Sequence, residues 1–273
     1  MRVLIDGREV DPREAGISVF DWTVQRGDGC FEAVRSYQGR LFRLGAHLRR
    51  LARSAALLDL PLPPLDRLED WAERVAQAGG DTVVRIMVTR GGTDPLVEAP
   101  SRVVVQWEPV PRFPDGFRLL PVAAPWHPSG ASWELAGAKS LSYAPNMAAQ
   151  RLAQRSGYDD ALLLGRDGQV LELPTSSIAW FSHDGLETPS LDLGILDSIT
   201  RQVVLEEAEL LGLAVREGRF PLERVAEADE ALVMSTLKEV RPVLRVGELV
   251  FEPGSRTVKL AEAFRSRVHA EVG

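Results

Sequence analysis

The most informative segment of this chain reads Leu135-Ala136-Gly137-Ala138-Lys139-Ser140-Leu141-Ser142-Tyr143. It places a single lysine among small and apolar residues, where burial of an ammonium group is costly and favours the neutral amine. A neutral lysine is a nucleophile that can form a Schiff base with a carbonyl compound. The alternative is a partly exposed loop lysine, which is the commoner situation for any one lysine. The choice between the two depends on the rest of the chain.

Composition and charge exclude several classes of protein. The chain has 273 residues, of which 45% are hydrophobic and 26% charged, as in an average globular protein. Its net charge of −7 argues against a nucleic-acid partner, which needs a basic surface. No apolar run reaches the roughly 20 residues that cross a bilayer, and no signal-peptide core is present. Because the only cysteine, Cys30, excludes an internal disulfide, we expect a cytoplasmic protein without a membrane partner.

Metal and nucleotide motifs are absent from the sequence. The four histidines show no metal-ligand spacing, and one cysteine cannot form a thiolate cluster. There is no Gly-x-Gly-x-x-Gly turn and no Walker-type loop. The sequence therefore disfavours metal, nicotinamide and nucleoside-triphosphate chemistry.

Periodicity predicts a smaller N-terminal domain that mixes strands and helices. Asp6-Gly7 is a strong hairpin signal after a first strand over 2–5. A helix is expected where apolar residues recur at spacings of three and four, at Leu44, Leu48, Leu51, Ala55 and Leu58. The other elements expected here are strands within 26–37, over 82–90 and over 102–107, and a helix over 65–77.

A proline-rich stretch over 109–116 is the best linker candidate, because it ends in the turn signal Asp115-Gly116. We therefore predict a smaller domain over 1–113 and a larger one over 114–273. In the larger domain we expect strands over 117–123, 178–181 and 231–235, a hairpin of 160–164 with 169–173, and helices over 144–156, 199–211 and 255–268.

Three polar features can each be interpreted in two ways. Arg85 projects from a strand that is apolar on both faces, so it needs either an internal ion pair or an anionic substrate. Ser198 begins a helix, where it can cap the first turn or help to bind a phosphate. Arg50 lies beside the apolar stripe of its helix and can be a solvated side chain or an anion ligand.

Taken in order, the motifs of the chain resemble the class IV aminotransferase-like enzymes, of the pyridoxal-phosphate fold type IV. The matching segments, spread over nearly the whole chain, are Gly27-Asp28-Gly29-Cys30-Phe31-Glu32, His47-Leu48-Arg49-Arg50-Leu51 with Ser54, Lys139-Ser140-Leu141-Ser142-Tyr143 with Asn146, Glu172 with Thr175-Ser176-Ser177, Gly194-Ile195-Leu196-Asp197-Ser198-Ile199-Thr200-Arg201, and Ser235-Thr236 with Glu239 and Pro242-Val243. The resemblance implies an α+β fold of two domains, the larger one with a β-barrel-like core.

The resemblance also implies a role for each candidate residue. Lys139 would hold pyridoxal 5'-phosphate as a Schiff base and then move the Cα proton of the substrate, while Glu172 would pair with the pyridine nitrogen. Arg50 would bind the phosphate together with the N-terminus of the helix at Ile199 and Thr200. The remaining cofactor-binding residues would be Tyr143, Ser176, Ser177 and Thr236, and the substrate-binding residues Arg26, Arg85 and Leu237.

Three positions depart from the pattern of the family. Leu173 and Ser177 stand where members commonly have glycine and asparagine, and Ser198 stands where they usually have glycine. None of these changes removes a functional side chain. They do make a close approach of the backbone to the phosphate less assured.

The family contains 4-amino-4-deoxychorismate lyase, an enzyme of folate biosynthesis, and several aminotransferases. D-amino-acid aminotransferases carry an arginine and a histidine after a Thr-Arg-Gly strand end, and residues 92–96, which follow Thr89-Arg90-Gly91, contain neither. Branched-chain enzymes usually have a tyrosine where this chain has Arg26. The sequence thus favours the lyase, which forms 4-aminobenzoate and pyruvate. A class IV aminotransferase and a non-catalytic protein of the same fold remain open, and the resemblance implies a homodimer.

Overall fold

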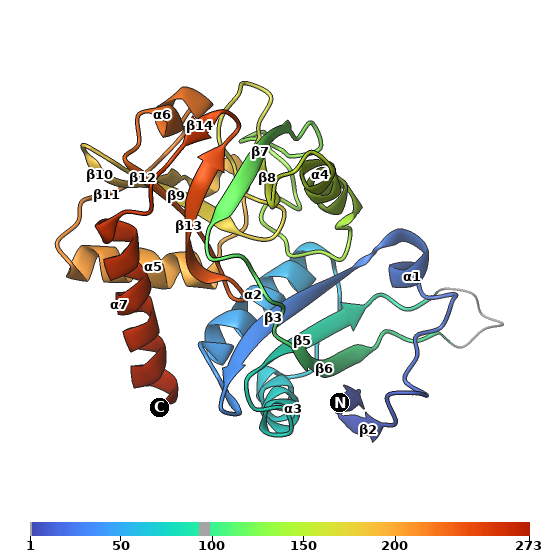
Figure 1. Cartoon of the computed structure of the whole chain (residues 1–273). Coiled ribbons are helices and arrows are strands. Elements are labelled where there is room, and N and C mark those ends of the chain that lie inside the picture. Colours follow the sequence, from blue (N-terminus) through green and yellow to red (C-terminus); the bar gives the residue numbers. More distant parts are fainter. Residues whose placement is uncertain (1, 93–98) are drawn as a thin grey trace. The chain divides into compact units, whose positions relative to one another are not determined.

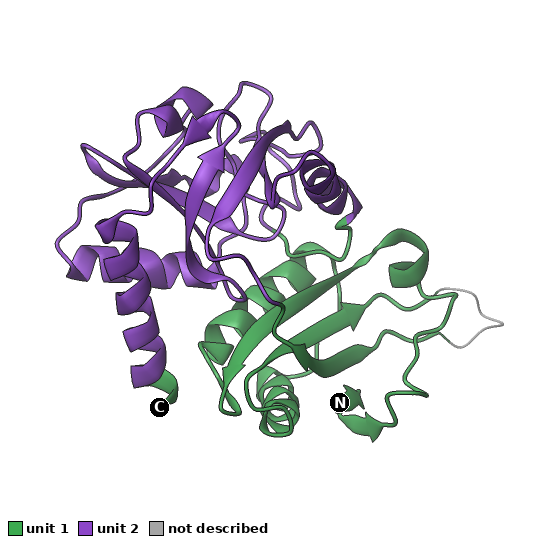
Figure 2. Ribbon diagram, viewed as in Figure 1, with its two compact units in different colours: residues 1–111, 138–143, 271–273 green, residues 112–137, 144–270 purple. Residues whose placement is uncertain are grey.

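The computed structural model describes residues 2–92 and 99–273 and divides into two compact units, coloured separately in Figure 2. Unit 1 comprises Met1–Pro111, Ala138–Tyr143 and Glu271–Gly273, and unit 2 comprises Arg112–Gly137 and Ala144–Ala270. The segment around Lys139, which we placed in the larger domain, groups with unit 1. Residues 93–98, whose first part we expected to be a loop, lie outside the described residues. Within the described part of the chain, no helix is long and apolar enough to cross a membrane.

Unit 1 is built on an antiparallel sheet of six strands in the order β2-β1-β6-β5-β3-β4 (Figure 1). Its elements are β1 (Val3–Ile5), β2 (Arg8–Val10), α1 (Trp22–Arg26), β3 (Gly29–Tyr37), β4 (Arg40–Leu41), α2 (Leu44–Leu57), α3 (Leu65–Gln77), β5 (Thr82–Thr89) and β6 (Val103–Pro109). The predicted hairpin, the two long helices and the strands of this part are confirmed.

One face of this sheet is covered by α2 and α3. Leu48 and Leu51 of α2 and Leu68 of α3 are buried in one cluster with Ile86 of β5 and Val105 of β6. Each of these side chains is at most 2% exposed. The apolar residues that alternate along the strands and those that form the helical stripes therefore pack in a single core. The apolar pattern that predicted α2 is therefore its buried face.

The short helix α1 was not expected from the sequence. Asp21 caps it by accepting the Thr23 N–H at 2.8 Å, and Gly27 ends it in the left-handed conformation with φ +72°. Five residues give no full apolar stripe, so periodicity carries no signal for such a helix. Gly27 thus caps the C-terminus of α1 in the left-handed conformation, which a residue without Cβ adopts most easily.

Unit 2 contains an eight-stranded mixed sheet in the order β11-β10-β9-β12-β13-β7-β8, with β14 paired to β13. Its elements are β7 (Phe117–Ala123), α4 (Ala144–Arg155), β8 (Asp160–Leu164), β9 (Ser177–Ser182), β10 (Gly185–Pro189), the 3-10 turn η1 (Leu191–Leu193), α5 (Ile199–Leu210), β11 (Val215–Gly218), α6 (Leu222–Ala226), β12 (Glu230–Ser235), β13 (Glu239–Val246), β14 (Leu249–Val250) and α7 (Ser255–Val272).

One expectation for unit 2 needs correction, and another is confirmed in part. The end strands β11 and β8 do not pair in the described residues, so the expected barrel-like core is an open sheet without a closed barrel. The predicted pairing of 160–164 with 169–173 is present: the Leu163 N–H donates to the Glu172 carbonyl at 2.9 Å, and the Leu171 N–H donates to the Leu163 carbonyl at 3.0 Å. Residues 169–173 form an isolated bridge there rather than a regular strand. The other partner of β8 is β7, which lies parallel to it; the sequence did not predict this pairing, because parallel strands are not joined by a short turn.

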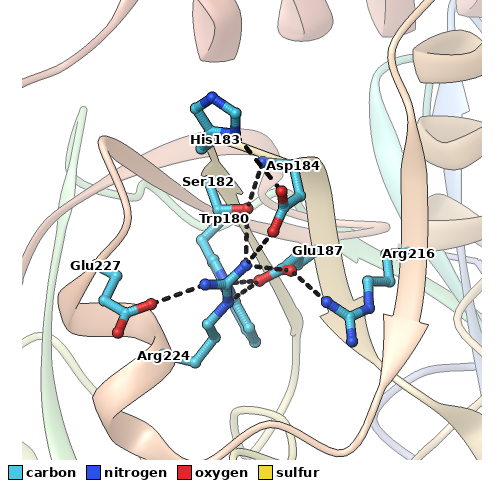
Figure 3. Close-up of polar contacts among 8 residues, drawn as sticks. All are labelled: Trp180, Ser182, His183, Asp184, Glu187, Arg216, Arg224 and Glu227. Atoms are coloured by element: carbon cyan, nitrogen blue, oxygen red, sulfur yellow. Dashed lines mark hydrogen bonds and ion pairs between the residues drawn. The ribbon is translucent and has the colours of Figure 1, made fainter.

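A buried carboxylate anchors one end of the unit 2 sheet (Figure 3). Glu187 of β10 is fully buried and accepts the Trp180 indole N–H at 2.9 Å and both Nε and Nη2 of Arg224 at 2.9 Å. Arg224 of α6 also contacts Asp184 at 2.7 Å. Burial raises the pKa of Glu187, but the hydrogen bonds from Arg224 and Trp180 outweigh it, so its pKa lies below the ordinary value.

We expect Arg224→Met to lower the midpoint of thermal unfolding by several degrees, because it leaves the Glu187 carboxylate buried without its cation. Since the pKa of Glu187 is lowered in the folded protein, its stabilisation is present above the unfolded pKa of about 4.3 and is lost as the pH falls. The deficit of the variant should therefore shrink in acid. Arg216→Met is the matched control, since Arg216 is exposed and 3.4 Å from Glu187, and an equal loss there would contradict the assignment.

Candidate active site

The backbone around Lys139 is held by β3 and α2 within unit 1. The Phe31 N–H donates to the Lys139 carbonyl at 3.0 Å, and the Leu141 N–H donates to the Gly29 carbonyl at 2.8 Å. The Lys139 N–H in turn donates to the Ser54 hydroxyl of α2 at 3.0 Å. A Cβ at Gly29 would lie 2.9 Å from the Leu141 side chain and 2.6 Å from a backbone oxygen. The absence of a side chain at Gly29 therefore lets the lysine segment approach the strand.

The amine of Lys139 lies beside two aromatic rings. Its Nζ is 4.5 Å from the centroid of Phe31 and 3.4 Å from the Tyr143 hydroxyl oxygen. The two rings pack edge to face, with centroids 5.3 Å apart. Among the described residues, the side-chain contacts of Lys139 Nζ are with Tyr143 and Phe31 and include no carboxylate. An amine that is half-buried, held at its backbone and without a carboxylate is placed to act as a nucleophile.

Next to this segment, a fully buried carboxylate is paired with two residues of α2. Glu32 of β3 accepts Nε and Nη2 of Arg50 at 2.7 and 2.8 Å, and it accepts Nδ1 of His47 at 2.8 Å. Burial raises the pKa of Glu32, but the charge and hydrogen bonds of Arg50 reverse this and hold it well below the usual range. Arg50 is therefore one half of a buried ion pair rather than a solvated helix arginine.

Burial in this environment also shifts the pKa values of His47 and Cys30. Burial lowers the pKa of His47 against the opposing effect of Glu32, so the ring is neutral at pH 7 and donates through Nδ1. Burial, together with the charge of Glu32, raises the pKa of the Cys30 thiol to about 12. The Cys30 thiol therefore does not serve as a thiolate nucleophile at neutral pH.

Sequence reasoning assigned no role to Glu32 or His47, although both lie in quoted motifs. The signal was available: Glu32 falls between Cys30 and Val34 in the buried register of β3, where an unpaired carboxylate is costly. A cationic or hydrogen-bonding partner was therefore required.

The expected substrate-binding arginines have partners of their own. Arg85 donates to Glu108 of β6 at 2.6 Å, which is the internal ion pair that the sequence left open as an alternative. Arg26 ends α1, is exposed, and lies with its guanidinium 4.6 Å from the ring centroid of Trp22. Of the two, only Arg26 presents an exposed cation.

Unit 2 carries the second set of candidates, which includes Glu172. One oxygen of its carboxylate, Oε2, accepts the Leu196 N–H at 3.2 Å, and the other, Oε1, lies 3.8 Å from Nε2 of His127. The side chain is only 14% exposed. A carboxylate that is nearly buried and oriented by a backbone amide can accept a hydrogen bond from a protonated ring nitrogen.

The N-terminus of α5 is a candidate phosphate site. Ser198 caps the helix by accepting the Arg201 N–H at 3.3 Å, which confirms the capping interpretation. Capping satisfies one of the first-turn amides, and the N–H groups of Ile199 and Thr200 have no acceptor within the helix. Both residues are only 3% exposed. Two buried amides at the positive end of a helix attract an anion.

The three hydroxyl residues Thr175, Ser176 and Ser177, the last of which begins β9, differ in their partners. Lys238 donates to Ser176 Oγ at 2.6 Å, to Thr175 Oγ1 at 3.2 Å and to Asp160 at 2.9 Å. Ser176 is thus part of an internal network. The Ser177 hydroxyl is buried and has no hydrogen-bond partner among the described residues, so of the three it is the one suited to an additional polar ligand.

Thr236 and Leu237 lie in the turn between β12 and β13. Both are half-buried, and the Lys238 N–H closes the turn by donating to the Ser235 hydroxyl at 3.2 Å. Their positions are compatible with a contact from backbone amides to an anion.

The residues present fit pyridoxal phosphate. This cofactor offers an aldehyde, a phenolic oxygen, a ring nitrogen and a phosphate. Unit 1 contains an amine beside a phenol, at Lys139 and Tyr143, which suit the first two groups. Unit 2 contains the Glu172 carboxylate and the α5 N-terminus, which suit the ring nitrogen and the phosphate. The unpartnered hydroxyl of Ser177 also indicates a polar ligand.

Comparisons with known proteins point to one family. Residues 29–246 match the family described as amino-transferase class IV. The chain is 32% identical over 277 residues to a putative branched-chain-amino-acid aminotransferase of Methanocaldococcus jannaschii, covering 97% of this chain and 96% of that protein. It is 35% identical over 233 residues to a bifunctional aminodeoxychorismate lyase / D-amino acid transaminase of Mycobacterium tuberculosis, covering 78% of this chain and 79% of that protein.

A solved structure agrees with this result. The fold is similar to that of a hypothetical aminotransferase from Mycobacterium tuberculosis in its PLP-bound form, with a TM-score of 0.91 and 26% identity over 99% of this chain and 100% of that one. The similarity extends over both units rather than over one of them.

We expect Arg50→Met to reduce the free energy of unfolding by about 3–5 kcal/mol, because it removes the cation from a fully buried carboxylate. The double change Arg50→Met/Glu32→Leu should recover much of this loss. Urea denaturation followed by circular dichroism measures both effects. Arg49→Met, at the exposed neighbouring position of the same helix, should change stability by less than about 0.5 kcal/mol. Equal losses at positions 49 and 50 would refute the buried pair.

Proposed function

The chain belongs to the class IV aminotransferase family, and from this premise we propose that it is 4-amino-4-deoxychorismate lyase, which forms 4-aminobenzoate and pyruvate. It is an enzyme, and its cofactor is pyridoxal phosphate. The amine of Lys139, which lies beside a phenol and an aromatic ring without an ion-pairing carboxylate among the described residues, supports the pyridoxal-phosphate chemistry. The choice of the lyase rests on the sequence after Thr89-Arg90-Gly91.

Bound pyridoxal phosphate supplies an electron sink for the substrate carbon that bears the amino group. We propose that Lys139 would hold the aldehyde end of the cofactor through Nζ, and that the same amine would take the proton from the substrate Cα. The Tyr143 hydroxyl, 3.4 Å from Nζ, is placed to hold the phenolic oxygen. Glu172 accepts the N–H of the ring nitrogen, so that positive charge at this nitrogen is stabilised.

We assign the phosphate to the amides of Ile199 and Thr200 and to Arg50. The two amides at the start of this twelve-residue helix can donate hydrogen bonds to the phosphate in fixed directions, and they carry the partial positive charge of the helix N-terminus. Arg50 contributes a full charge, and its pair with Glu32 fixes the plane of the guanidinium. We further assign Ser177 and Thr236 as additional polar contacts of the cofactor.

The strand end at Thr89-Arg90-Gly91 supports the lyase over a D-amino-acid aminotransferase. The sequence after it has neither the arginine nor the histidine that those enzymes carry. Arg90 itself donates to both oxygens of Asp28, at 2.9 and 3.0 Å, so it is committed to holding the glycine-rich segment. Arg26, exposed at the end of α1, is the arginine that we propose for a substrate carboxylate.

A class IV aminotransferase is the second candidate. It is supported by the relatives, since the Methanocaldococcus protein is named as an aminotransferase and the Mycobacterium protein combines the lyase with a transaminase. Both reactions need the same amine, carboxylate and phosphate site, and they differ in the fate of the electron pair left on the substrate.

We also propose that the enzyme is a cytoplasmic homodimer, and the exposed apolar side chains of Val19, Phe20 and Val24 are suited to a subunit contact.

Lys139→Ala should abolish covalent attachment of the cofactor. The sequence contains only three lysines, Lys139, Lys238 and Lys259, so borohydride reduction followed by peptide mass spectrometry identifies the attached residue directly. The wild type should carry the added mass on Lys139 alone. Lys259→Ala, at an exposed site on α7, is the matched control and should keep full labelling. Label on another lysine would overturn the assignment.

Purified enzyme with aminodeoxychorismate should release 4-aminobenzoate and pyruvate in equal amounts, and Lys139→Ala should lower this rate at least about 1000-fold. Fluorescence of 4-aminobenzoate and coupled oxidation of NADH with lactate dehydrogenase measure the two products. Turnover of amino-acid and keto-acid pairs with no 4-aminobenzoate formed would reject the lyase in favour of the aminotransferase.

A further inference from the structure

The imidazole of His127 is fixed by the turn that carries it. The Ser129 N–H donates to His127 Nδ1 at 3.2 Å. Nδ1 must therefore hold a lone pair, and the proton of the neutral ring lies on Nε2. The backbone thus selects one of the two tautomers, and it directs the N–H of the ring away from the turn.

The protonated nitrogen of this tautomer lies next to Glu172. Nε2 is 3.8 Å from Oε1 of the carboxylate, which is longer than a direct hydrogen bond but close enough for the N–H dipole to act on the charge. The side chains of His127 and Glu172 are only 9% and 14% exposed, so solvent screens the interaction weakly. Leu196 N–H donates to Oε2, and the His127 ring lies beside the other oxygen.

The two donors belong to one packed piece of unit 2. Gly130, in the same turn as His127, donates its N–H to the Leu193 carbonyl at 3.0 Å. Pro128 packs so closely on Gly194 that a Cβ there would lie 2.8 Å from the proline ring. The segment that carries the Leu196 amide and the turn that carries His127 are therefore fixed to each other, and both act on the carboxylate of Glu172.

His127 also lines an opening on unit 2. A cavity of about 280 Å³ is lined by His127 together with Trp126, Trp133 and Arg166, and Glu172 is not among its lining residues. His127 thus borders the cavity and also lies beside the carboxylate. Imidazole can therefore be tested as a replacement for the ring in His127→Gly.

We propose that His127 is a positioning residue that holds the Glu172 carboxylate, through Nε2–H, in the orientation that receives the ring nitrogen of pyridoxal phosphate. It touches neither substrate nor cofactor in this assignment and acts only through Glu172. The proposal deepens the proposed function and rests on it, since Glu172 is the partner of the ring nitrogen there. An ionised carboxylate is the form that stabilises a protonated ring nitrogen.

Two substitutions separate this role from a purely structural one. In His127→Asn the side-chain oxygen can still accept the Ser129 N–H, but no donor reaches Glu172. In His127→Gln the longer side chain places its N–H near the position of Nε2. The positioning role predicts that Asn weakens pyridoxal phosphate binding about tenfold, whereas Gln stays within about twofold of the wild type.

Titration of the apo-enzyme with pyridoxal phosphate, followed by absorbance, measures the affinity and the spectrum of the bound cofactor together. We expect a shifted absorption band in His127→Asn and a wild-type band in His127→Gln. Imidazole added to His127→Gly should restore the wild-type band through the cavity. Equal loss in the Asn and Gln variants, or unchanged binding in both, would overturn the proposal. Thermal unfolding of the apo-proteins shows whether either variant has lost its fold.

A measurement on the apo-protein keeps the inference separate from the proposed function. Nitrogen-15 NMR should show the Nε2–H tautomer for His127, assigned by the loss of its signals in His127→Gln. Glu172→Gln should shift the Nε2 signal, because it removes the charge beside it. If the wild type binds no pyridoxal phosphate, the proposed function fails whatever this experiment gives. If the tautomer is Nδ1–H, or Glu172→Gln leaves the signal unchanged, the inference fails although the cofactor binds.

Discussion

The burial of one carboxylate, Glu32, is the constraint on which the rest of unit 1 depends. A fully buried negative charge is stable only when its partners are supplied in fixed geometry, and here α2 supplies Arg50 and His47. That requirement fixes the rotation and height of α2 on β3. The same helix face then presents Ser54, whose hydroxyl holds the backbone of Lys139. The nucleophile is thus positioned by an ion pair to which it makes no direct hydrogen bond.

Much of the fold follows from local patterns in the sequence. The stripe of α2 and the alternation of β5 predicted both elements because their apolar residues face one core. Ser198 predicted the start of α5, since an N-cap acts within its own first turn. The lysine and the carboxylate of the candidate site were found because their residue types fall in an ordered set of family motifs.

The remaining features depend on pairings between residues far apart in the chain. Nothing near Arg85 in the sequence indicates that Glu108 is its partner, because the contact comes from strand register. Nothing near Ser176 indicates that Lys238 donates to its hydroxyl. The open sheet of unit 2, expected as barrel-like, likewise depends on which strands become neighbours. Local propensity carries no information on such contacts, so these were the interpretations that the structure had to decide or correct.

The assignment of Ala138–Tyr143 to unit 1 has a consequence for the synthesis of the protein. During translation the N-terminal residues emerge first and can begin to pair their strands before the rest of the chain exists. The edge of β3 at Gly29 and Phe31, however, receives its backbone partners from residues more than a hundred positions later. Until those residues leave the ribosome, this edge has unpaired amide and carbonyl groups, which is the kind of surface that chaperones protect. The nascent unit 1 is therefore completed by the same segment that delivers the reactive lysine.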